Sequence, residues 1–350
     1  MTKSALCVIF KVMRKLTDKL AQERILSRGE FAELLTCEDD YLHEAARKAR
    51  ENIYGNKIFL RGLIEFTSYC KNDCFYCGLR RSNSSAARYR LSKEQILNCC
   101  DEGYDAGYRT FVLQGGEDAF FTDEILTDII RAIKCKYPDC ALTLSTGERG
   151  FESLKLLREA GADRYLLRHE TADSAHYAEL HPPEMQASAR QKCLRDLKEL
   201  GFQTGCGFMV GSPKQTLENI VSDLLFIKEL DPEMVGVGPF IPHSATPFAK
   251  EKAGNLKLVL NILAILRLMK PSLLLPATTA LATIENQGYE LGINAGANVI
   301  MQNISPLTAR EKYKIYDNKI GASENLKQRI KNIGCEFTVA RGDYFNYGEQ

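Results

Sequence analysis

Eight short apolar runs alternate with helical patterns between residues 58 and 301, and this alternation constrains the fold more than any other feature. The runs are nearly continuous in apolar character, which is typical of parallel strands buried on both faces. They cover residues 58–66, 110–113, 141–145, 164–168, 203–210, 234–241, 273–277 and 297–301. The helical patterns cover residues 93–106, 123–136, 151–160, 187–200, 216–230 and 256–269. Eight strands alternating with helices over ~250 residues predict an α/β fold, a (β/α)8 TIM-type barrel.

A glycine stands just before the next strand at Gly107, Gly161, Gly201 and Gly296, and the first three of these directly follow a helical pattern. Glycine at this position adopts the left-handed C-cap conformation and lets the chain turn back to the sheet. The alternative fold is an open doubly wound sheet, but no GxGxxG opens a helix after the first strand. The sequence therefore favours the barrel.

The segments outside the predicted barrel are short. Residues 1–55 are mostly polar helix, and we expect them to form an N-terminal helical cap on a barrel of residues 56–306. Residues 307–350 are Lys-rich and less regular, which predicts a C-terminal helical extension closing one barrel end. No Gly/Ser-rich or Pro-rich linker interrupts the chain, so we expect a single domain over residues 1–350.

The charge and the N-terminus limit the compartment and the partners. The 46 Lys+Arg and 45 Asp+Glu leave a formal net charge of +1, which argues against binding to nucleic acid or to an anionic membrane. The apolar run at residues 5–10 is short for a signal peptide, and no small-residue cleavage site follows it. No later run approaches the ~18 apolar residues of a membrane span. We expect a cytoplasmic protein.

Twelve cysteines are unexpected in such a chain, because 350 residues can bury a core without disulfides and intracellular disulfides are rare. Nine of them are interpreted as small buried side chains. These nine are Cys7, Cys37, Cys99, Cys100, Cys135, Cys140, Cys193, Cys206 and Cys335. The other three, Cys70, Cys74 and Cys77, directly follow the first predicted strand with the spacing C-x3-C-x2-C.

This cysteine triplet falls at the C-terminal end of a strand, where barrel active sites are built. A closed zinc site requires a fourth ligand, and no nearby His or Cys supplies one. Cubane iron–sulfur clusters normally take four cysteines, so three leave one iron with an open coordination position. The triplet therefore predicts a [4Fe–4S] cluster at which a substrate or cofactor can bind and receive an electron, with an incomplete zinc knuckle or a chance triplet as the alternatives.

The triplet, with Tyr76 before its last cysteine, resembles the radical SAM superfamily. The resemblance implies that the open iron binds S-adenosylmethionine (SAM) and that the reduced cluster cleaves it to a 5′-deoxyadenosyl radical. The stretches CGLRRSN (77–83), GADRYLLRHETA (161–172) and GVGPFIPHSATP (236–247) resemble the HydE family of [FeFe]-hydrogenase maturases. That likeness implies a sulfur-containing, cysteine-derived iron carbonyl/cyanide substrate in the assembly of the hydrogenase H-cluster.

The resemblance also assigns SAM-binding residues by position. Gly116 and Glu117 belong to a GGE element after the second strand, and Ser145 ends the third strand. Glu170 lies in the RHET sequence after the fourth strand. Arg190 begins the next helix and would pair with the SAM carboxylate through two parallel hydrogen bonds. Without the resemblance, Arg190 would be interpreted as a solvated helix residue.

Two arginines point to the substrate. Arg61 and Arg168 fall within otherwise apolar strands, where an unpaired charge is costly, and so indicate an anionic ligand inside the barrel. The alternative is that each pairs with a barrel carboxylate such as Glu65.

Further residues are assigned to the cavity or excluded from it. The resemblance places Thr278, Thr279 and Met301 at positions that line the substrate cavity. His169 and His243 are interpreted as structural, because a radical reaction requires no histidine base.

The expected cofactors are one [4Fe–4S] cluster and SAM. Residues 313–350 contain only Cys335, so we predict no second cluster. We expect a small-molecule or organometallic substrate, with other hydrogenase maturases and an electron donor as candidate partners. Two other functions stay open: a radical SAM amino-acid mutase of the methylornithine synthase type, and a non-catalytic iron–sulfur protein.

Overall fold

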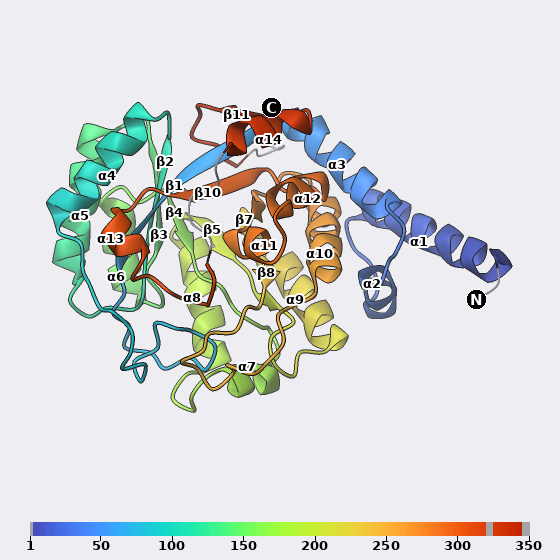
Figure 1. Cartoon of the computed structure of the whole chain (residues 1–350), viewed down its shortest axis with the longest axis horizontal. Coiled ribbons are helices and arrows are strands. Elements are labelled where there is room, and N and C mark those ends of the chain that lie inside the picture. Colours follow the sequence, from blue (N-terminus) through green and yellow to red (C-terminus); the bar gives the residue numbers. More distant parts are fainter. Residues whose placement is uncertain (1–2, 320–324, 345–350) are drawn as a thin grey trace.

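A barrel of parallel strands forms the centre of the molecule (Figure 1). The computed structural model describes residues 3–319 and 325–344. The barrel strands follow the order β7-β5-β4-β3-β2-β1-β10-β9, and a parallel bridge from Met234 of β7 to Leu274, just before β9, closes the ring. The strands are β1 (Lys57–Thr67), β2 (Thr110–Gly115), β3 (Ala141–Ser145), β4 (Arg164–Leu166), β5 (Gln203–Cys206), β7 (Met234–Val235), β9 (Pro276–Ala277) and β10 (Val299–Asn303). The predicted (β/α)8 barrel is confirmed.

Two predicted strands are each split in the structure. The run 203–210 forms β5 and β6 (Met209–Val210), and the run 234–241 forms β7 and β8 (Gly238–Pro239). The break occurs where two glycines meet, because a Cβ on Gly207 would lie 2.1 Å from the carbonyl oxygen of Gly236. Beyond this contact, β6 and β8 pair with each other in a separate two-stranded parallel sheet.

Helices cover the outside of the barrel. They are α4 (Lys93–Asp105), α5 (Asp123–Lys136), α6 (Phe151–Glu159), α7 (Ser174–Leu180), α8 (Ala187–Glu199), α9 (Leu217–Leu230), α10 (Leu256–Met269), α11 (Thr279–Ile284) and α12 (Gly288–Asn294). The four expected C-cap glycines all have positive φ, from 72° at Gly201 to 114° at Gly161. The short helices α7, α11 and α12 were not predicted, because six or seven residues show too little of the 3.6-residue period.

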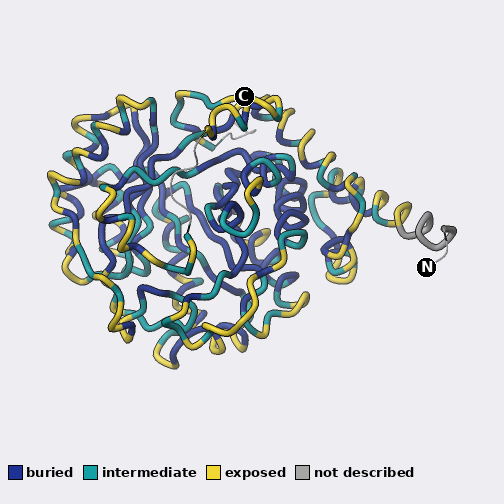
Figure 2. The backbone as a smooth tube through the Cα atoms, in the orientation of Figure 1, coloured by how far each residue is buried: buried dark blue, intermediate teal, exposed yellow. Residues whose placement is uncertain are grey.

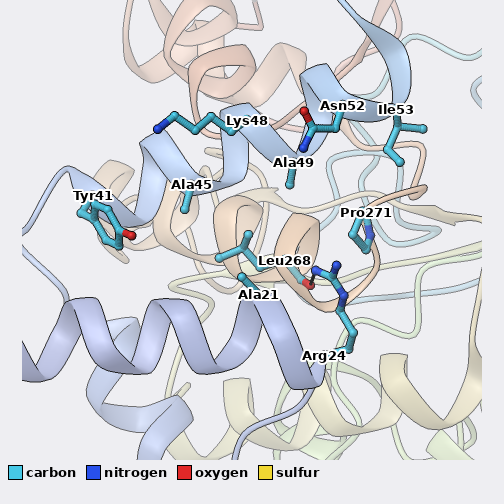
Figure 3. A pocket seen from close by; sticks show the side chains of 10 residues that line it. All are labelled: Ala21, Arg24, Tyr41, Ala45, Lys48, Ala49, Asn52, Ile53, Leu268 and Pro271. Carbon is cyan, nitrogen blue, oxygen red and sulfur yellow. Dashed lines mark hydrogen bonds between the residues drawn. The ribbon is translucent and has the colours of Figure 1, made fainter.

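The N-terminal helices α1 (Lys3–Glu23), α2 (Arg28–Leu35) and α3 (Tyr41–Tyr54) occupy the segment for which a helical cap was predicted. They pack on the flank formed by α10, which explains why α10 is apolar on nearly every side. Figure 1 shows α1 extending beyond the barrel. A pocket of about 470 Å³ lies between α1, α3 and the end of α10, and its lining includes small side chains such as Ala45 and Ala49 (Figure 3). Among the described residues, none of the helices has the length and apolar character needed to cross a membrane.

Side chains alternate between the two faces of β1. Ile58, Ile64 and Phe66 belong to the main core between barrel and helices. The alternate residues, including Arg61 and Glu65, therefore point into the barrel. Buried positions fill the centre of the molecule in Figure 2, and both of these charged residues are among them.

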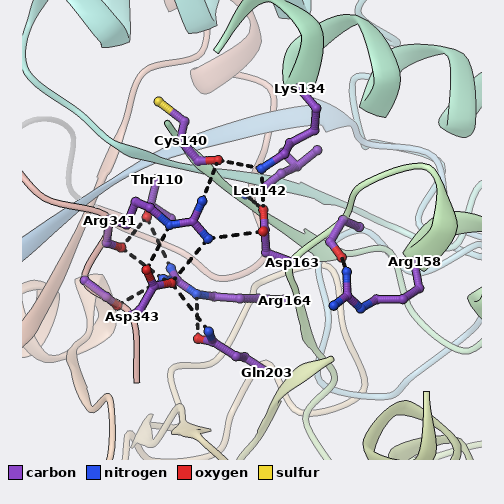
Figure 4. A network of polar contacts seen from close by, with 12 residues as sticks. Thr110, Lys134, Cys140, Leu142, Arg158, Asp163, Arg164, Gln203, Arg341 and Asp343 are labelled. Atoms are coloured by element: carbon purple, nitrogen blue, oxygen red, sulfur yellow. Dashed lines mark hydrogen bonds and ion pairs between the residues drawn. The ribbon is translucent and has the colours of Figure 1, made fainter. Parts of the chain in front are cut away.

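The C-terminal segment contains α13 (Leu307–Arg310), α14 (Leu326–Asn332) and an unpredicted strand, β11 (Glu336–Thr338). β11 pairs in parallel with the first residues of β1, at the N-terminal end of the barrel. Beyond it, the fully buried Arg164 donates to the carbonyl oxygens of Arg341 and Gly342, both at 3.0 Å, and to Asp343 at 2.8 Å (Figure 4). The part of the segment from β11 to Asp343 thus covers the base of the barrel, opposite the strand ends that carry the cysteine triplet.

Most of the other cysteines are buried, as predicted. Seven of the nine are buried free thiols: Cys37, Cys99, Cys100, Cys140, Cys193, Cys206 and Cys335. Cys135 is exposed on α5, so the prediction is wrong there. The side chain of Cys7 lies outside the described residues.

Candidate functional site

The three spaced cysteines lie in the loop of residues 68–90 between β1 and α4, which we call the cluster loop. An antiparallel bridge between Thr67 and Arg90 closes its base. Inside it, the Asp73 carboxylate accepts two hydrogen bonds from Arg80, at 2.7 and 2.8 Å, and one from the Ser82 hydroxyl at 2.6 Å. The bonds from Arg80 hold the pKa of Asp73 well below its usual range. The loop is therefore ordered by its own side chains.

The cysteine thiols are free and partly buried. Burial raises the pKa of Cys70 and Cys74, and that of Cys77 to about 12, so bound iron would have to displace their protons. No three His, Cys, Asp or Glu side chains among the described residues converge to hold a single ion. A cubane cluster instead takes one thiolate for each iron. Three thiols in one loop fit such a cluster.

The GGE element at the end of β2 lies directly against the cluster loop. A Cβ on Gly116 would be 2.2 Å from the Tyr69 carbonyl oxygen and 2.7 Å from Cβ of Cys70. The backbone N–H of Lys71 also donates to the carbonyl of Glu117, at 2.8 Å. Glycine is thus required for the close packing of two backbones, in addition to any contact with SAM. Ser145, at the end of β3, lies beside this element through its register with Gln114.

Arg190 on α8 is buried, with only 6% of its surface exposed, so the interpretation as a solvated residue is wrong. Its Nε donates to Glu148 at 2.5 Å and its Nη1 to the carbonyl of Arg168 at 3.0 Å. Glu117 lies 4.0 Å away. Burial opposes the charge of Arg190, but Tyr177 and Glu148 outweigh it and raise the pKa of the guanidinium. The positively charged guanidinium of Arg190 is therefore held beside the GGE element and the cluster loop.

Glu170 has a left-handed backbone, with φ of 64°. This conformation is costly for a residue with a side chain, and such strain clusters at functional sites. The residue is buried, and its Oε2 has no hydrogen-bond partner among the described residues. An unpaired buried carboxylate in a strained turn next to the cluster loop fits a ligand-binding role.

His181 forms a hydrogen bond with Tyr76 of the cluster loop, a contact that was not predicted. Burial lowers the pKa of His181 to about 3, so the imidazole is neutral. Its Nδ1 lies 3.0 Å from the carbonyl oxygen of Tyr177 and must carry the proton, which leaves Nε2 to accept from the Tyr76 hydroxyl at 3.2 Å. No residue pattern around His181 indicates this role.

Neither barrel arginine forms an ion pair with Glu65 or with any other described carboxylate, so that alternative is wrong. Glu65 accepts hydrogen bonds from Lys319 and, at 2.6 Å, from Asn303. Arg61 is buried, its Nη1 lies 3.1 Å from the sulfur of Met234, and its Nε and Nη2 have no partner among the described residues. Nε of Arg168 lies 3.9 Å from the position that a Cβ on Gly236 would take.

The register brings three of the expected substrate residues together. Arg61 pairs with Met301, and Ala277 pairs with Ile300, so Thr278 lies next to Met301 on the same inner wall. The Thr278 hydroxyl also caps α11 by accepting from the N–H of Leu281 at 3.3 Å. Thr279 is placed differently, because its hydroxyl contacts Tyr289 of α12.

The two histidines considered as bases have structural contacts. Nε2 of the fully buried His169 lies 3.3 Å from Asp223 on α9, and its ring packs on Phe226. Nδ1 of His243 accepts from the N–H of Ala245 at 3.0 Å.

A parallel barrel whose first strand ends in C-x3-C-x2-C, with a GGE element packed on that loop, defines a class of enzyme. Residues 64–227 match the sequence model of the Radical SAM superfamily. Together with the relatives below, this match shows that the chain belongs to the radical SAM superfamily. Membership implies a [4Fe–4S] cluster and SAM as cofactors.

Within the superfamily, the chain is 43% identical over 311 residues to the [FeFe] hydrogenase maturase subunit HydE of Thermotoga maritima, covering 88% of each chain. It is 30% identical over 329 residues to a 3-methylornithine synthase of Methanosarcina acetivorans, covering 91% of this chain and 92% of that protein. A crystal structure of methylornithine synthase matches the fold with a TM-score of 0.81 at 28% identity, covering 92% of this chain and 97% of that one.

Proposed function

We propose that the protein is a HydE-type [FeFe]-hydrogenase maturase acting on a sulfur-containing, cysteine-derived iron carbonyl/cyanide substrate during assembly of the H-cluster. The observation that carries this proposal is the 43% identity to HydE over 88% of both chains. When bound, the reduced cluster supplies one electron to SAM, whose cleavage yields the 5′-deoxyadenosyl radical. The protein's own residues would hold, orient and enclose the reactants.

Cys70, Cys74 and Cys77 would ligate three irons of the cluster and leave the fourth open to SAM. We propose one cluster in this chain, because residues 313–350 contain only Cys335.

Residues at four places around the cluster loop would hold SAM. Gly116 and Glu117 would present the backbone of the GGE element, with Ser145 beside them. Glu170 would use its unpaired carboxylate oxygen, for example at the ribose hydroxyls. Arg190 would bind the SAM carboxylate through its planar guanidinium.

The substrate would lie inside the barrel. Arg61 supports an anionic ligand, because a buried guanidinium with unpaired donors is costly without one. Arg168 would hold the same ligand from the opposite wall, and Met301 and Thr278 would line the cavity between them, with Thr279 at its edge. We further propose a single-domain, cytoplasmic enzyme that works with other hydrogenase maturases and an external electron donor.

The experiment uses anaerobically reconstituted full-length protein with dithionite and SAM. We expect 5′-deoxyadenosine to form, and we expect Cys74→Ala to bind less iron and form none. Cell-free maturation of an [FeFe]-hydrogenase that lacks its HydE then tests the substrate class. The proposal is wrong if 5′-deoxyadenosine never forms, or if it forms but the hydrogenase stays inactive in a system that authentic HydE restores.

A second candidate is an amino-acid mutase of the methylornithine synthase type. The TM-score of 0.81 to methylornithine synthase favours it as an alternative, because the two barrels share almost their whole length. Formation of 3-methylornithine from lysine by the reconstituted protein would select this function. A non-catalytic iron–sulfur protein would show an EPR signal that SAM leaves unchanged.

A further inference from the structure

The guanidinium of Arg88 joins the two flanks of the cysteine triplet. Its Nη1 donates to the carbonyl oxygens of Ser68 and, at 2.9 Å, of Leu79. Its Nη2 donates to the carbonyls of Arg80 at 2.7 Å and Asn83 at 3.4 Å. Ser68 precedes Cys70 by two residues, and Leu79 follows Cys77 by two. A single planar side chain thus fixes the distance between the start and the end of the metal-binding segment.

The charge of Arg88 is not neutralised by a carboxylate. The other cations of the cluster loop all have acidic partners: Lys71 with Glu117, Arg80 with Asp73, Arg81 with Glu184 and Arg90 with Asp118. Arg88 makes no ion pair with any described residue, and its hydrogen bonds go to neutral carbonyls. The positive charge of Arg88 therefore acts electrostatically on the groups nearest to it, without a carboxylate to neutralise it.

Those groups include two of the cysteine ligands. The carbonyl oxygens that Nη1 of Arg88 binds belong to Ser68 and Leu79, and each of these residues is two positions from a cysteine ligand, Cys70 or Cys77. Arg88 therefore stands close enough to the thiols to act on the charge of whatever they bind. The reduction potential of an iron–sulfur cluster depends on the net charge around it, and a nearby cation favours the reduced, more negative state.

We propose that Arg88 is a positioning residue with two effects: it clamps the cluster loop around the [4Fe–4S] cluster, and it raises the midpoint potential of that cluster. The reaction affected is a one-electron reduction, with dithionite or a protein donor as the reductant. The proposal rests on the cluster that superfamily membership implies and does not depend on the identity of the substrate.

The test compares Arg88→Gln, Arg88→Lys and the control Arg81→Gln on reconstituted full-length protein. Lysine keeps the charge but lacks the planar fork that reaches several carbonyls. Arg81 lies in the same loop, is exposed, and is 3.9 Å from Glu184. Two quantities are measured without substrate: the rate of iron release to bathophenanthroline, and the midpoint potential from an EPR-monitored redox titration.

For Arg88→Gln we expect about tenfold faster iron release, the effect of losing charge-assisted hydrogen bonds, and a lower midpoint potential. Arg88→Lys should release iron faster than wild type but keep a potential near the wild-type value. Arg81→Gln should change neither quantity. One outcome is that Arg88→Gln folds, as judged by circular dichroism that matches wild type, yet takes up no iron. That result supports the clamp, and the midpoint potential of Arg88→Lys then tests the effect of charge.

The proposal is overturned if Arg88→Gln behaves like Arg81→Gln in both measurements. A potential in Arg88→Lys that falls as far as in Arg88→Gln would refute the effect of charge. Should Arg88→Gln fail to fold, wild-type iron retention in Arg88→Lys would refute the clamp. Because neither measurement uses substrate, failure here is separate from failure of the proposed maturase function.

Discussion

Glu65, fully buried inside the barrel, pairs with Lys319 from the C-terminal segment that crosses the barrel mouth. The same segment binds the cluster loop, through a hydrogen bond from Gly78 N–H to the carbonyl of Ile315 at 3.0 Å. Burial raises the pKa of Glu65 despite the ammonium beside it. A carboxyl whose pKa is raised by folding contributes most stability at low pH, and this contribution falls as pH rises through the unfolded and then the folded pKa.

Lys319→Met should therefore lower the free energy of unfolding by about 3 kcal/mol, because it leaves a buried carboxylate unpaired. Denaturant unfolding measured at about pH 5 and about pH 8 should show the larger loss at the higher pH, where Glu65 must ionise. The double variant Lys319→Met/Glu65→Gln should recover part of the stability and lose most of this pH dependence. A double variant no more stable than the single one would contradict the prediction.

Gly116→Ala should disrupt the cluster loop. The new methyl group would meet backbone atoms of Tyr69 and the side chain of Cys70, so the loop must move. We expect less iron bound per chain after anaerobic reconstitution. Gly150→Ala is the matched control, because a Cβ there meets nothing within 4 Å and the backbone φ is −69°. Equal iron content in the two variants would show that the close packing is not needed for cluster binding.

Features set by local sequence could be predicted. The bounds of α5 and α10 match the predicted ranges to the residue, since a long amphipathic or apolar pattern is a local property. The cysteine spacing likewise indicated its chemistry without any long-range information. The pair Glu65–Lys319 was not predictable, because it joins residues 254 positions apart across an irregular segment.

The parts of the site that escaped prediction depend on backbone carbonyls or on turn geometry. Arg88 binds only carbonyl oxygens, which every residue carries, so no residue type marks its partners. The strain at Glu170 likewise has no sequence signal, since glutamate rarely adopts a positive φ. The burial of Arg190 was also not predictable from its helical pattern, because polar helix residues are usually exposed.

Asp343→Asn should make the base of the barrel less stable at neutral pH. Burial raises the pKa of Asp343, but Arg341 and Arg164 outweigh it and hold the pKa below its usual value. A carboxyl with a depressed folded pKa stabilises above its unfolded pKa, and this stability is lost as pH falls through the folded pKa. The difference in melting temperature from wild type should therefore shrink once the pH falls below about 3.9, the unfolded pKa of an aspartate, and vanish below the folded pKa. A pH-independent difference would contradict an electrostatic origin.

Arg190 and Glu148 should have opposite effects on SAM affinity. Glu148 occupies Nε of Arg190 at 2.5 Å, so it competes with any other carboxylate for that guanidinium. Calorimetry with the reconstituted protein should show SAM bound about tenfold more weakly by Arg190→Gln. Glu148→Gln keeps the shape of the side chain and should bind SAM more tightly than wild type. Weaker binding in both variants would mean that Glu148 itself assists SAM.

Glu170→Gly should separate stability from function. Glycine relieves the left-handed backbone strain and removes a buried carboxylate oxygen without a described partner, so we expect a gain of about 1 kcal/mol in unfolding free energy. SAM affinity should fall about tenfold, since the carboxylate is lost. Lys214→Gly is the control, because Lys214 also has a φ of 62° but pairs with Glu179 only at the surface. It should relieve strain and leave SAM affinity unchanged. If Glu170→Gly binds SAM as well as the control does, then Glu170 does not contact the cofactor and its strain has another cause.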